Sequence, residues 1–149
     1  MDEAHLLCRA GSCVCALPLV HVSETMRALP LEALGGMPDF VLGLAIVRGA
    51  PTPVVDVSRL VGGARGAPAR FVTVKTRRTP LALAFDEVLG VRVLAPRSLQ
   101  EIPPLLGGSR AGIVSAIGAL DRELLVLLEA ARALPESVWA ALAARGARP

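Results

Sequence analysis

The sequence predicts a mainly β fold, of the small-barrel or sandwich kind, that ends in one α-helix. Short apolar runs recur along the chain, and clusters of Gly and Pro separate them, which predicts many short strands. The helix is predicted because Pro135 precedes an apolar stripe at helical spacing and Gly146 follows it. We therefore expect a helix over about residues 135–145, with Trp139 anchoring it to the sheets.

The first strands are expected to form a hairpin. Leu6–Arg9 and Val14–Leu17 are apolar runs on either side of Gly11-Ser12. This region also holds the three cysteines of the chain, Cys8, Cys13 and Cys15. Cys13 and Cys15 would share one face of a strand, where they cannot easily form a disulfide with each other. We expect all three thiols to serve as small core hydrophobes, and their odd number favours a reducing compartment.

The next segment, Val20–Arg27, has an ambiguous pattern. Val20 and Val22 alternate with polar residues as in a strand, whereas Val22 and Met26 also fit helical spacing. The sequence therefore leaves both alternatives open here.

The stretch Gly43–Val57 predicts a second hairpin, with a turn at Arg48-Gly49-Ala50 and a second strand that runs into Asp56. If the chain turns at Gly49-Ala50, Arg48 faces Pro51 across the strands. Asp56 would then lie several residues away, so we do not expect an ion pair between Arg48 and Asp56.

Two prolines constrain the second strand of this hairpin. Pro51 and Pro53 remove two N–H donors from the same side, which predicts a sheet edge or a bulge there. Leu81–Phe85 is apolar on both faces, as in a strand that is covered on both sides. Further strands are expected at Phe71–Lys75 and Val88–Leu94, and in a closing hairpin of Ile113–Leu120 and Leu124–Leu128 around Asp121-Arg122.

Composition and charge exclude several classes of function. The net charge is +3, the basic residues are scattered, and only Arg77-Arg78 are adjacent, so no nucleic-acid footprint is predicted. Aromatic residues, which bind single strands by stacking, make up 3% of the chain. The uncharged run Ala10–Ser23 is too short to cross a bilayer, and the acidic Met-Asp-Glu start does not suit a signal peptide. We expect a cytoplasmic protein with no direct membrane insertion.

No catalytic residue, metal or cofactor is predicted. The Gly-rich stretches 62–66 and 107–112 lack the ending of a phosphate-binding loop, and His5 and His21 fit no metal-ligand spacing. Asp86-Glu87 is expected to cap a strand and face solvent. Arg48 is an isolated cation at the rim of an apolar hairpin, which suits a recognition surface or a solvated rim charge. The same alternatives apply to Glu24 and Arg27.

Several segments, in order, resemble the CheW-like adaptor domain of bacterial chemosensory systems, from about Leu6 to Leu142. The most specific part is similar to that family's strand, Arg-Gly turn and Pro-x-x-Asp strand. Its signature positions here are Gly43, Arg48, Gly49, Pro53 and Asp56. The other matching segments are Ala16–Leu19, Val22–Glu24, Met26-Arg27, Pro38–Val41, Ala84–Val88 with Val91, Gly118–Leu120 and Leu124–Leu128.

This resemblance implies two interleaved five-stranded SH3-like β-barrels around a shared hydrophobic core, and a single CheW-like domain over residues 1–149. It also implies a non-catalytic adaptor that couples the cytoplasmic tips of chemoreceptors to the regulatory domain of a CheA-type histidine kinase, with recruitment to receptor arrays. By position, Val22, Glu24 and Arg48 would lie on or near the receptor-facing surface. Val88 and Val91 would line a groove between the barrels, where an apolar receptor helix could dock.

The chain departs from the family pattern at three places, one of which is Cys8 to Cys15, where the family has commoner strand residues. Ile46 stands where the family often has Asn, and Leu81–Phe85 lacks the usual Gly. These departures leave open a divergent protein that mainly contacts other CheW-like proteins or the kinase in a non-motility pathway. A small-ligand sensor that uses the groove between the barrels is a further alternative.

Overall fold

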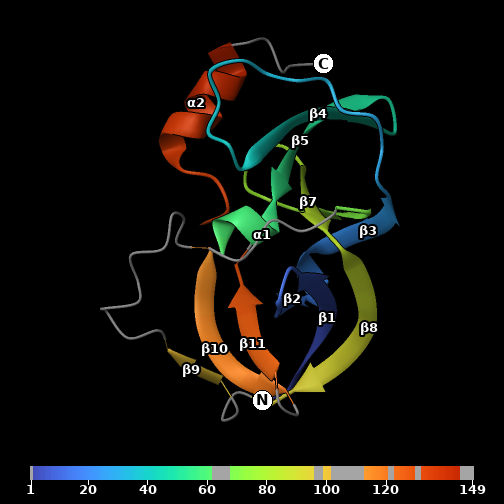
Figure 1. The fold of residues 1–149 in the computed structure, drawn as a ribbon, viewed down its shortest axis with the longest axis vertical. Coiled ribbons are helices and arrows are strands. Elements are labelled where there is room, and N and C mark those ends of the chain that lie inside the picture. Colours follow the sequence, from blue (N-terminus) through green and yellow to red (C-terminus); the bar gives the residue numbers. More distant parts are fainter. Residues whose placement is uncertain are drawn as a thin grey trace.

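The computed structural model describes residues 2–61, 68–95, 99–101, 113–120, 123–129 and 132–144. These residues form two β-sheets that lie against each other, with one helix at the C-terminal end (Figure 1). The strands are β1 Glu3–Ala10, β2 Cys13–Pro18, β3 Val22–Arg27, β4 Val41–Val47, β5 Ala50–Asp56, β6 Arg70–Val74, β7 Leu81–Phe85, β8 Glu87–Leu94, β9 Leu99–Glu101, β10 Val114–Leu120 and β11 Glu123–Leu128. The helices are a 3-10 turn at Leu19–His21, α1 Val57–Leu60 and α2 Glu136–Ala144.

The two sheets are interleaved along the chain. One sheet has the order β8-β1-β2-β11-β10-β9, and the other has the order β3-β6-β7-β5-β4. The chain therefore begins in the first sheet, builds the whole second sheet, and returns to the first through β8. This arrangement confirms the predicted mainly β fold class, and the three-residue strand β9 adds a sixth strand to the sheet expected to hold five.

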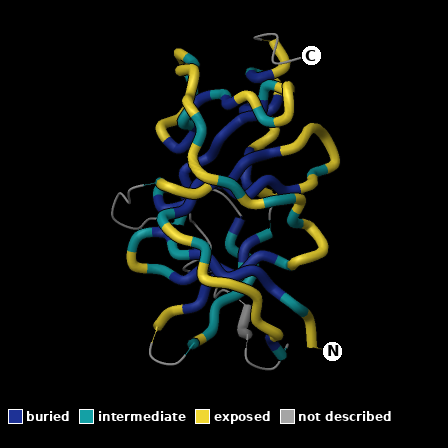
Figure 2. The backbone as a smooth tube through the Cα atoms, turned by 90° about the vertical axis from the view of Figure 1, so that its right-hand side faces the viewer, coloured by how far each residue is buried: buried dark blue, intermediate teal, exposed yellow. Residues whose placement is uncertain are grey.

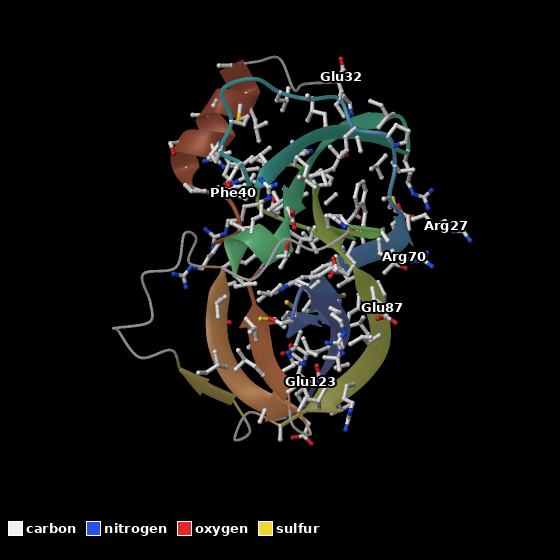
Figure 3. All side chains as sticks on the ribbon, viewed as in Figure 1. Arg27, Glu32, Phe40, Arg70, Glu87 and Glu123 are labelled. Atoms are coloured by element: carbon white, nitrogen blue, oxygen red, sulfur yellow. The ribbon has the colours of Figure 1, made fainter. Side chains whose placement is uncertain are left out.

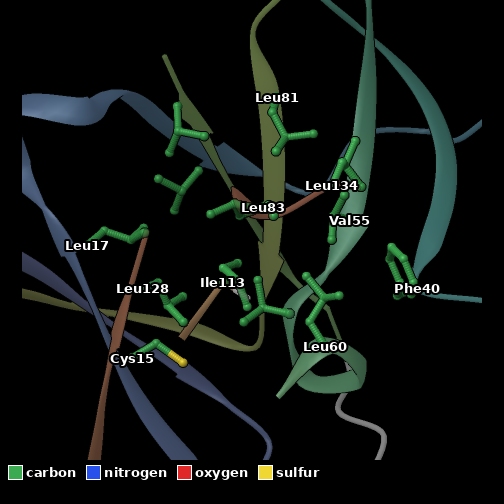
Figure 4. Close-up of a cluster of buried hydrophobic side chains, with 14 of the residues drawn as sticks. Cys15, Leu17, Phe40, Val55, Leu60, Leu81, Leu83, Ile113, Leu128 and Leu134 are labelled. Carbon is green, nitrogen blue, oxygen red and sulfur yellow. The ribbon is translucent and has the colours of Figure 1, made fainter. Parts of the chain in front are cut away.

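The largest core cluster lies between the two sheets, and each sheet also buries a smaller cluster on its far face. In β7, Leu81, Leu83 and Phe85 join the central cluster, whereas Ala82 and Ala84 join the far one. The predicted two-sided burial of this strand is thus confirmed. Figure 2 shows that the middle of the molecule is buried and that loops and edges are exposed, and Figure 4 shows the central cluster with side chains from both sheets.

The first hairpin forms as predicted, with Ala10 opposite Cys13 across the turn. Cys8 and Cys15 lie opposite each other in the ladder, are fully buried and remain free thiols. Burial raises the pKa of the Cys8 thiol to about 12 and raises that of Cys15 as well. These two cysteines are core residues as expected, and Cys13 is half-buried.

The ambiguous segment is a strand from Val22 onward, preceded by the 3-10 turn. It is a strand because β6, nearly 50 residues later in the chain, pairs with it antiparallel. The partner of Glu24 in that ladder, for example, is Thr73. Pairing of this kind is a tertiary contact, so the local pattern alone could not decide between strand and helix.

The hairpin of β4 and β5 turns at Arg48 and Gly49, and both residues have positive φ angles, 49° and 80°. Two such residues form a tight turn whose twist matches that of the flanking strands. Ile46 therefore lies opposite Pro51, and the expectation that Arg48 faces Pro51 was wrong by two positions. Only the residues Val54–Asp56 of β5 pair with β7. Pro51 and Pro53 come before this stretch, so the side of β5 that would otherwise pair with β7 has no partner strand at the two prolines, as predicted.

Helix α2 begins one residue after Pro135, whose carbonyl oxygen accepts hydrogen bonds from the backbone N–H groups of Val138 and Trp139. Val138, Trp139 and Leu142 are buried in the central cluster, which confirms the predicted stripe and the anchoring role of Trp139. Gly146, the Asp121-Arg122 turn and the two Gly-rich stretches lie outside the described residues. In the part of the chain that is described, no helix has the length and apolar character needed to cross a bilayer.

Candidate functional site

Asp56, the last residue of the signature, has a structural position. It is buried and caps α1, since its carboxylate accepts hydrogen bonds from the backbone N–H and the hydroxyl of Ser58 at 3.2 and 2.7 Å. Its own N–H donates to the carbonyl of Phe40, and Arg59 lies 3.5 Å from its second carboxylate oxygen. Asp56 thus orients the end of β5 and does not form part of an exposed surface.

Gly43 is required by a close backbone contact. Glu32 forms an isolated antiparallel β-bridge with Leu44 of β4, and the two residues exchange backbone hydrogen bonds of 2.8 and 2.9 Å. The φ angle of Gly43 is +142°, and a Cβ atom at this position would lie 2.4 Å from the carbonyl oxygen of Glu32. Gly49 supplies the turn and Pro53 lies opposite Leu44 in the ladder. The four signature residues other than Arg48 therefore shape the hairpin that carries Arg48.

Arg48 forms a two-pronged ion pair with Glu24. Its Nε donates to Oε1 at 2.7 Å and its Nη2 donates to Oε2 at 3.0 Å. The Arg48 side chain is 80% exposed and that of Glu24 is 31% exposed. The hydrogen bonds hold the pKa of the Glu24 carboxyl below its usual value and raise that of Arg48.

This ion pair corrects the expectation that Arg48 is an isolated cation. It joins the edge strand β3 to the tip of the β4–β5 hairpin, and Asp56 takes no part, as expected. The sequence placed Glu24 and Arg48 on the same surface only through the family resemblance. No local pattern pairs them, because they lie 24 residues apart.

Val88 and Val91 lie on the edge strand β8, on the side that faces the other sheet. Val88 is opposite Cys8 and Val91 is opposite Leu6, and both partners belong to the central core. Residues directly opposite in a ladder point to the same face. Val88 is half-buried against that core, whereas Val91 is 57% exposed.

Two further exposed residues share these faces. Val93 is opposite Ala4 on β8, and Thr25 on the other sheet's edge strand β3 is opposite the core residue Val72. We call the exposed margin of the core at these two edge strands the β3–β8 seam, with the residues Val22, Thr25, Val88, Val91 and Val93. Sequence reasoning missed Thr25 and Val93, although the alternation of Val91 and Val93 around Arg92 was a signal for the latter.

The predicted partner-binding residues thus fall into two groups. Val22, Val88 and Val91 belong to the seam, with Val22 half-buried against the central core. Glu24 is opposite Thr73, and the neighbouring pair of Met26 and Phe71 packs on the far face of the sheet. The Glu24–Arg48 pair therefore lies toward the other face of β3 from the seam.

A cavity of about 250 Å³ lies between the β6–β7 loop and the start of α2. Its walls include Arg78, Glu136 and Trp139; Arg78 forms an ion pair with Glu136, and its guanidinium carbon lies 5.8 Å from the centre of a Trp139 ring. None of its lining residues belongs to the seam. In the described part of the chain, no three His, Cys, Asp or Glu side chains are grouped so that they could hold a metal ion.

Comparison with known proteins gives consistent results. The family model described as CheW-like domain matches residues 4–138. Protein FrzA of Myxococcus xanthus is 32% identical over 141 residues, which covers 89% of this chain and 86% of that protein. A probable chemotaxis protein CheW of Rhizobium etli is 24% identical over 131 residues, covering 86% and 84% of the two chains. The crystal structure of the scaffolding protein TtCheW from Thermoanaerobacter tengcongensis superposes with a TM-score of 0.75 at 19% identity, over 87% of this chain and 90% of that one.

Proposed function

The chain belongs to the CheW-like domain family, and from this premise we propose that it is a non-catalytic adaptor that couples chemoreceptors to a CheA-type histidine kinase. The observation that carries the proposal is the β3–β8 seam, an apolar core margin left exposed at two edge strands. Exposed apolar residues that continue a core are typical of surfaces that bind other proteins.

The seam suits a helix better than an added strand. Val91 and Val93 project from one face of β8, and the exposed Thr25 lies on the core-facing side of β3, so the apolar surface lies on a sheet face rather than along a backbone edge. An amphipathic helix binds such a surface through apolar anchors spaced about one turn apart. We assign this position to the cytoplasmic tip of a chemoreceptor, which the family resemblance implies as a partner.

The Glu24–Arg48 pair provides a second, polar contact region. Glu24 holds the Arg48 guanidinium in one orientation, and most of that side chain is exposed to a partner. A guanidinium fixed in this way loses less conformational entropy on binding than a free one. In the proposed complex, Arg48 sets the orientation of the partner while the seam supplies apolar contact area.

We also propose that residues 1–149 act as one CheW-like domain in the cytoplasm, at receptor arrays. Ile46 supports a variant of this role, because this apolar residue is 59% exposed on the edge strand β4, close to the Arg48 turn. An exposed apolar side chain at that place favours contact with another CheW-like protein or with the kinase. A divergent pathway that relies on those contacts is therefore the second candidate.

The test is binding of the purified chain to a chemoreceptor tip fragment and to a CheA regulatory domain from the same organism, measured by calorimetry. Val91→Asp places a charge in the seam, and Arg92→Glu is the matched control, because Arg92 is the next residue on β8 and faces away from the seam opposite His5. We expect Val91→Asp to weaken receptor binding about tenfold or more and Arg92→Glu to leave it unchanged. If the folded chain binds neither partner, the proposal is refuted; if it binds the kinase domain but no receptor, the second candidate is supported.

A further inference from the structure

Two arginines face each other at one end of the seam. Arg27 is the last residue of β3, Arg70 is the first residue of β6, and the two are directly opposite in the ladder. Arg70 alternates with Val72 and Val74, which belong to the central core, so both arginines lie on the side of their sheet that faces the other sheet. Both side chains are exposed, and Figure 3 shows them on neighbouring strands at the edge of the molecule.

Arg27 and Arg70 are two cations directly opposite each other in a ladder, and neither has a carboxylate partner in the described part of the chain. Arg9, Arg48, Arg59, Arg78 and Arg132 each form an ion pair with a carboxylate. Within the described residues, no carboxylate lies at ion-pair distance from Arg27 or Arg70. Like charges directly opposite each other in a sheet are unfavourable. One bound anion could therefore interact with both positive charges at once.

Glu24, three residues before Arg27, is paired with Arg48, and two further acidic residues follow Phe85, the ladder partner of Arg70. Asp86 follows the end of β7, and its carboxylate accepts a hydrogen bond from the backbone N–H of Gly11 at 2.9 Å. Glu87 is opposite Arg9 in the ladder of β1 and β8. Neither carboxylate neutralises the two facing arginines.

The arginine pair is continuous with the apolar seam. Arg70 is opposite Phe85, the last residue of β7, and β8 begins two residues later. Val88, the first seam residue of β8, is therefore only three residues after Phe85, the ladder partner of Arg70. A segment that lies along the seam over Val88 and Val91 would bring one of its ends to the two guanidinium groups.

We propose that Arg27 and Arg70 form a two-guanidinium site at the end of the β3–β8 seam, and that this site binds a carboxylate side chain of the docked partner segment. The inference rests on the proposed function, since the partner is the helical segment that occupies the seam. Guanidinium groups bind carboxylates through paired hydrogen bonds, so two of them give a geometric as well as an electrostatic preference. Two cations are too few for a polybasic membrane site or a nucleic-acid footprint, which need larger clusters.

The experiment measures binding of the receptor tip fragment to the unmodified chain and to the double variant Arg27→Gln/Arg70→Gln, at low and at high salt. We expect the double variant to bind about tenfold or more weakly at low salt and to lose most of the salt dependence. Arg92→Glu is the matched control and should bind like the unmodified chain. Both arginines are exposed, so thermal unfolding should be unchanged or slightly higher in the double variant.

Carboxylates of the tip fragment are then changed one at a time, Glu to Gln and Asp to Asn. We expect one change to weaken binding to the unmodified chain and to have no further effect on the double variant, which is the signature of a direct contact. Equal binding by the double variant, or an absence of such coupling, overturns the inference. A lipid role would give a different result: without that coupling, the unmodified chain would bind phosphatidylserine vesicles and the double variant would not. This result would assign the two arginines to lipid binding and would also overturn the inference.

The receptor site at the seam and the arginine site can be told apart by experiment. If Val91→Asp loses receptor binding while Arg27→Gln/Arg70→Gln keeps it, the seam is the receptor site and only the arginine inference is wrong. If the unmodified, folded chain binds no receptor tip at all, the proposed function fails and this inference fails with it.

Discussion

Replacing Gly43 by Ala should destabilise the protein through a single added methyl group. The Cβ atom would lie 2.4 Å from the carbonyl oxygen of Glu32, 3.0 Å from its carbonyl carbon and 3.4 Å from the Cα atom of Ala33. All three are backbone atoms, so no flexible side chain can move aside. The φ angle of +142° is also one that residues with a side chain rarely adopt.

Two terms set the size of the effect. Holding a non-glycine residue in such a backbone conformation costs about 1–3 kcal/mol. Moving the segment of Glu32 away would break the two backbone hydrogen bonds to Leu44, each worth about 1 kcal/mol. The backbone strain remains even when the Glu32 segment moves, so the two costs add, and we expect a loss of roughly 3–5 kcal/mol in the free energy of unfolding, or a fall of about 10 °C in melting temperature.

The assay is urea and thermal unfolding followed by circular dichroism, with Gly35→Ala as the matched control. A Cβ atom at Gly35 meets nothing within 4 Å, and Gly35 has no positive φ angle. The control should be neutral or gain a few tenths of a kcal/mol, because alanine restricts the unfolded chain. If Gly43→Ala matched Gly35→Ala in stability, the structural explanation of this signature glycine would be refuted.

Three further outcomes are expected. Arg48→Glu should weaken receptor-tip binding about tenfold or more and lower the melting temperature by only a few degrees, because the lost ion pair with Glu24 is exposed; a collapsed melting temperature would instead give Arg48 a structural role. Trp139→Ala should lower the free energy of unfolding in urea by roughly 3 kcal/mol or more, as a large-to-small change in the core, and a near-neutral result would mean that α2 is not docked. Because burial raises the pKa of Cys8 to about 12, its thiol stays protonated at about pH 8, so mass spectrometry after iodoacetamide treatment should find the half-buried Cys13 modified first; modification of Cys8 at the same rate would contradict this.

The sequence predicted the elements whose causes are local. The Gly11-Ser12 hairpin, the apolar faces of β7 and the start of α2 after Pro135 all follow from turn chemistry and from periodicities of two or about 3.6 residues. The missing partner strand beside Pro51 and Pro53 also has a local cause, because proline lacks an N–H group in any setting. These features needed no knowledge of which strands become neighbours.

The errors and omissions concern contacts between distant segments. The turn is formed by Arg48 and Gly49, not by Gly49 and Ala50, so the register of the hairpin differs from the expected one. Two residues with positive φ match the twist of the strands, but arginine rarely adopts a positive φ, so the sequence did not indicate Arg48 as a turn residue. The partner of Arg48 could not be named, since Glu24 lies on a strand that reaches the hairpin tip only when the whole sheet has formed. Sequence reasoning also had no way to see that Arg27 would face Arg70.

The amino-acid sequence by itself determined most of the strands and their buried faces, the first hairpin turn and the family. Only the tertiary structure decided which charges meet and which apolar residues stay exposed at the β3–β8 seam. The physical reason is that side-chain alternation depends on the neighbouring residues of one strand, whereas strand order depends on burying the apolar faces of both sheets together. Contacts such as Glu24 with Arg48 and Arg27 with Arg70 exist only after that collective choice has been made.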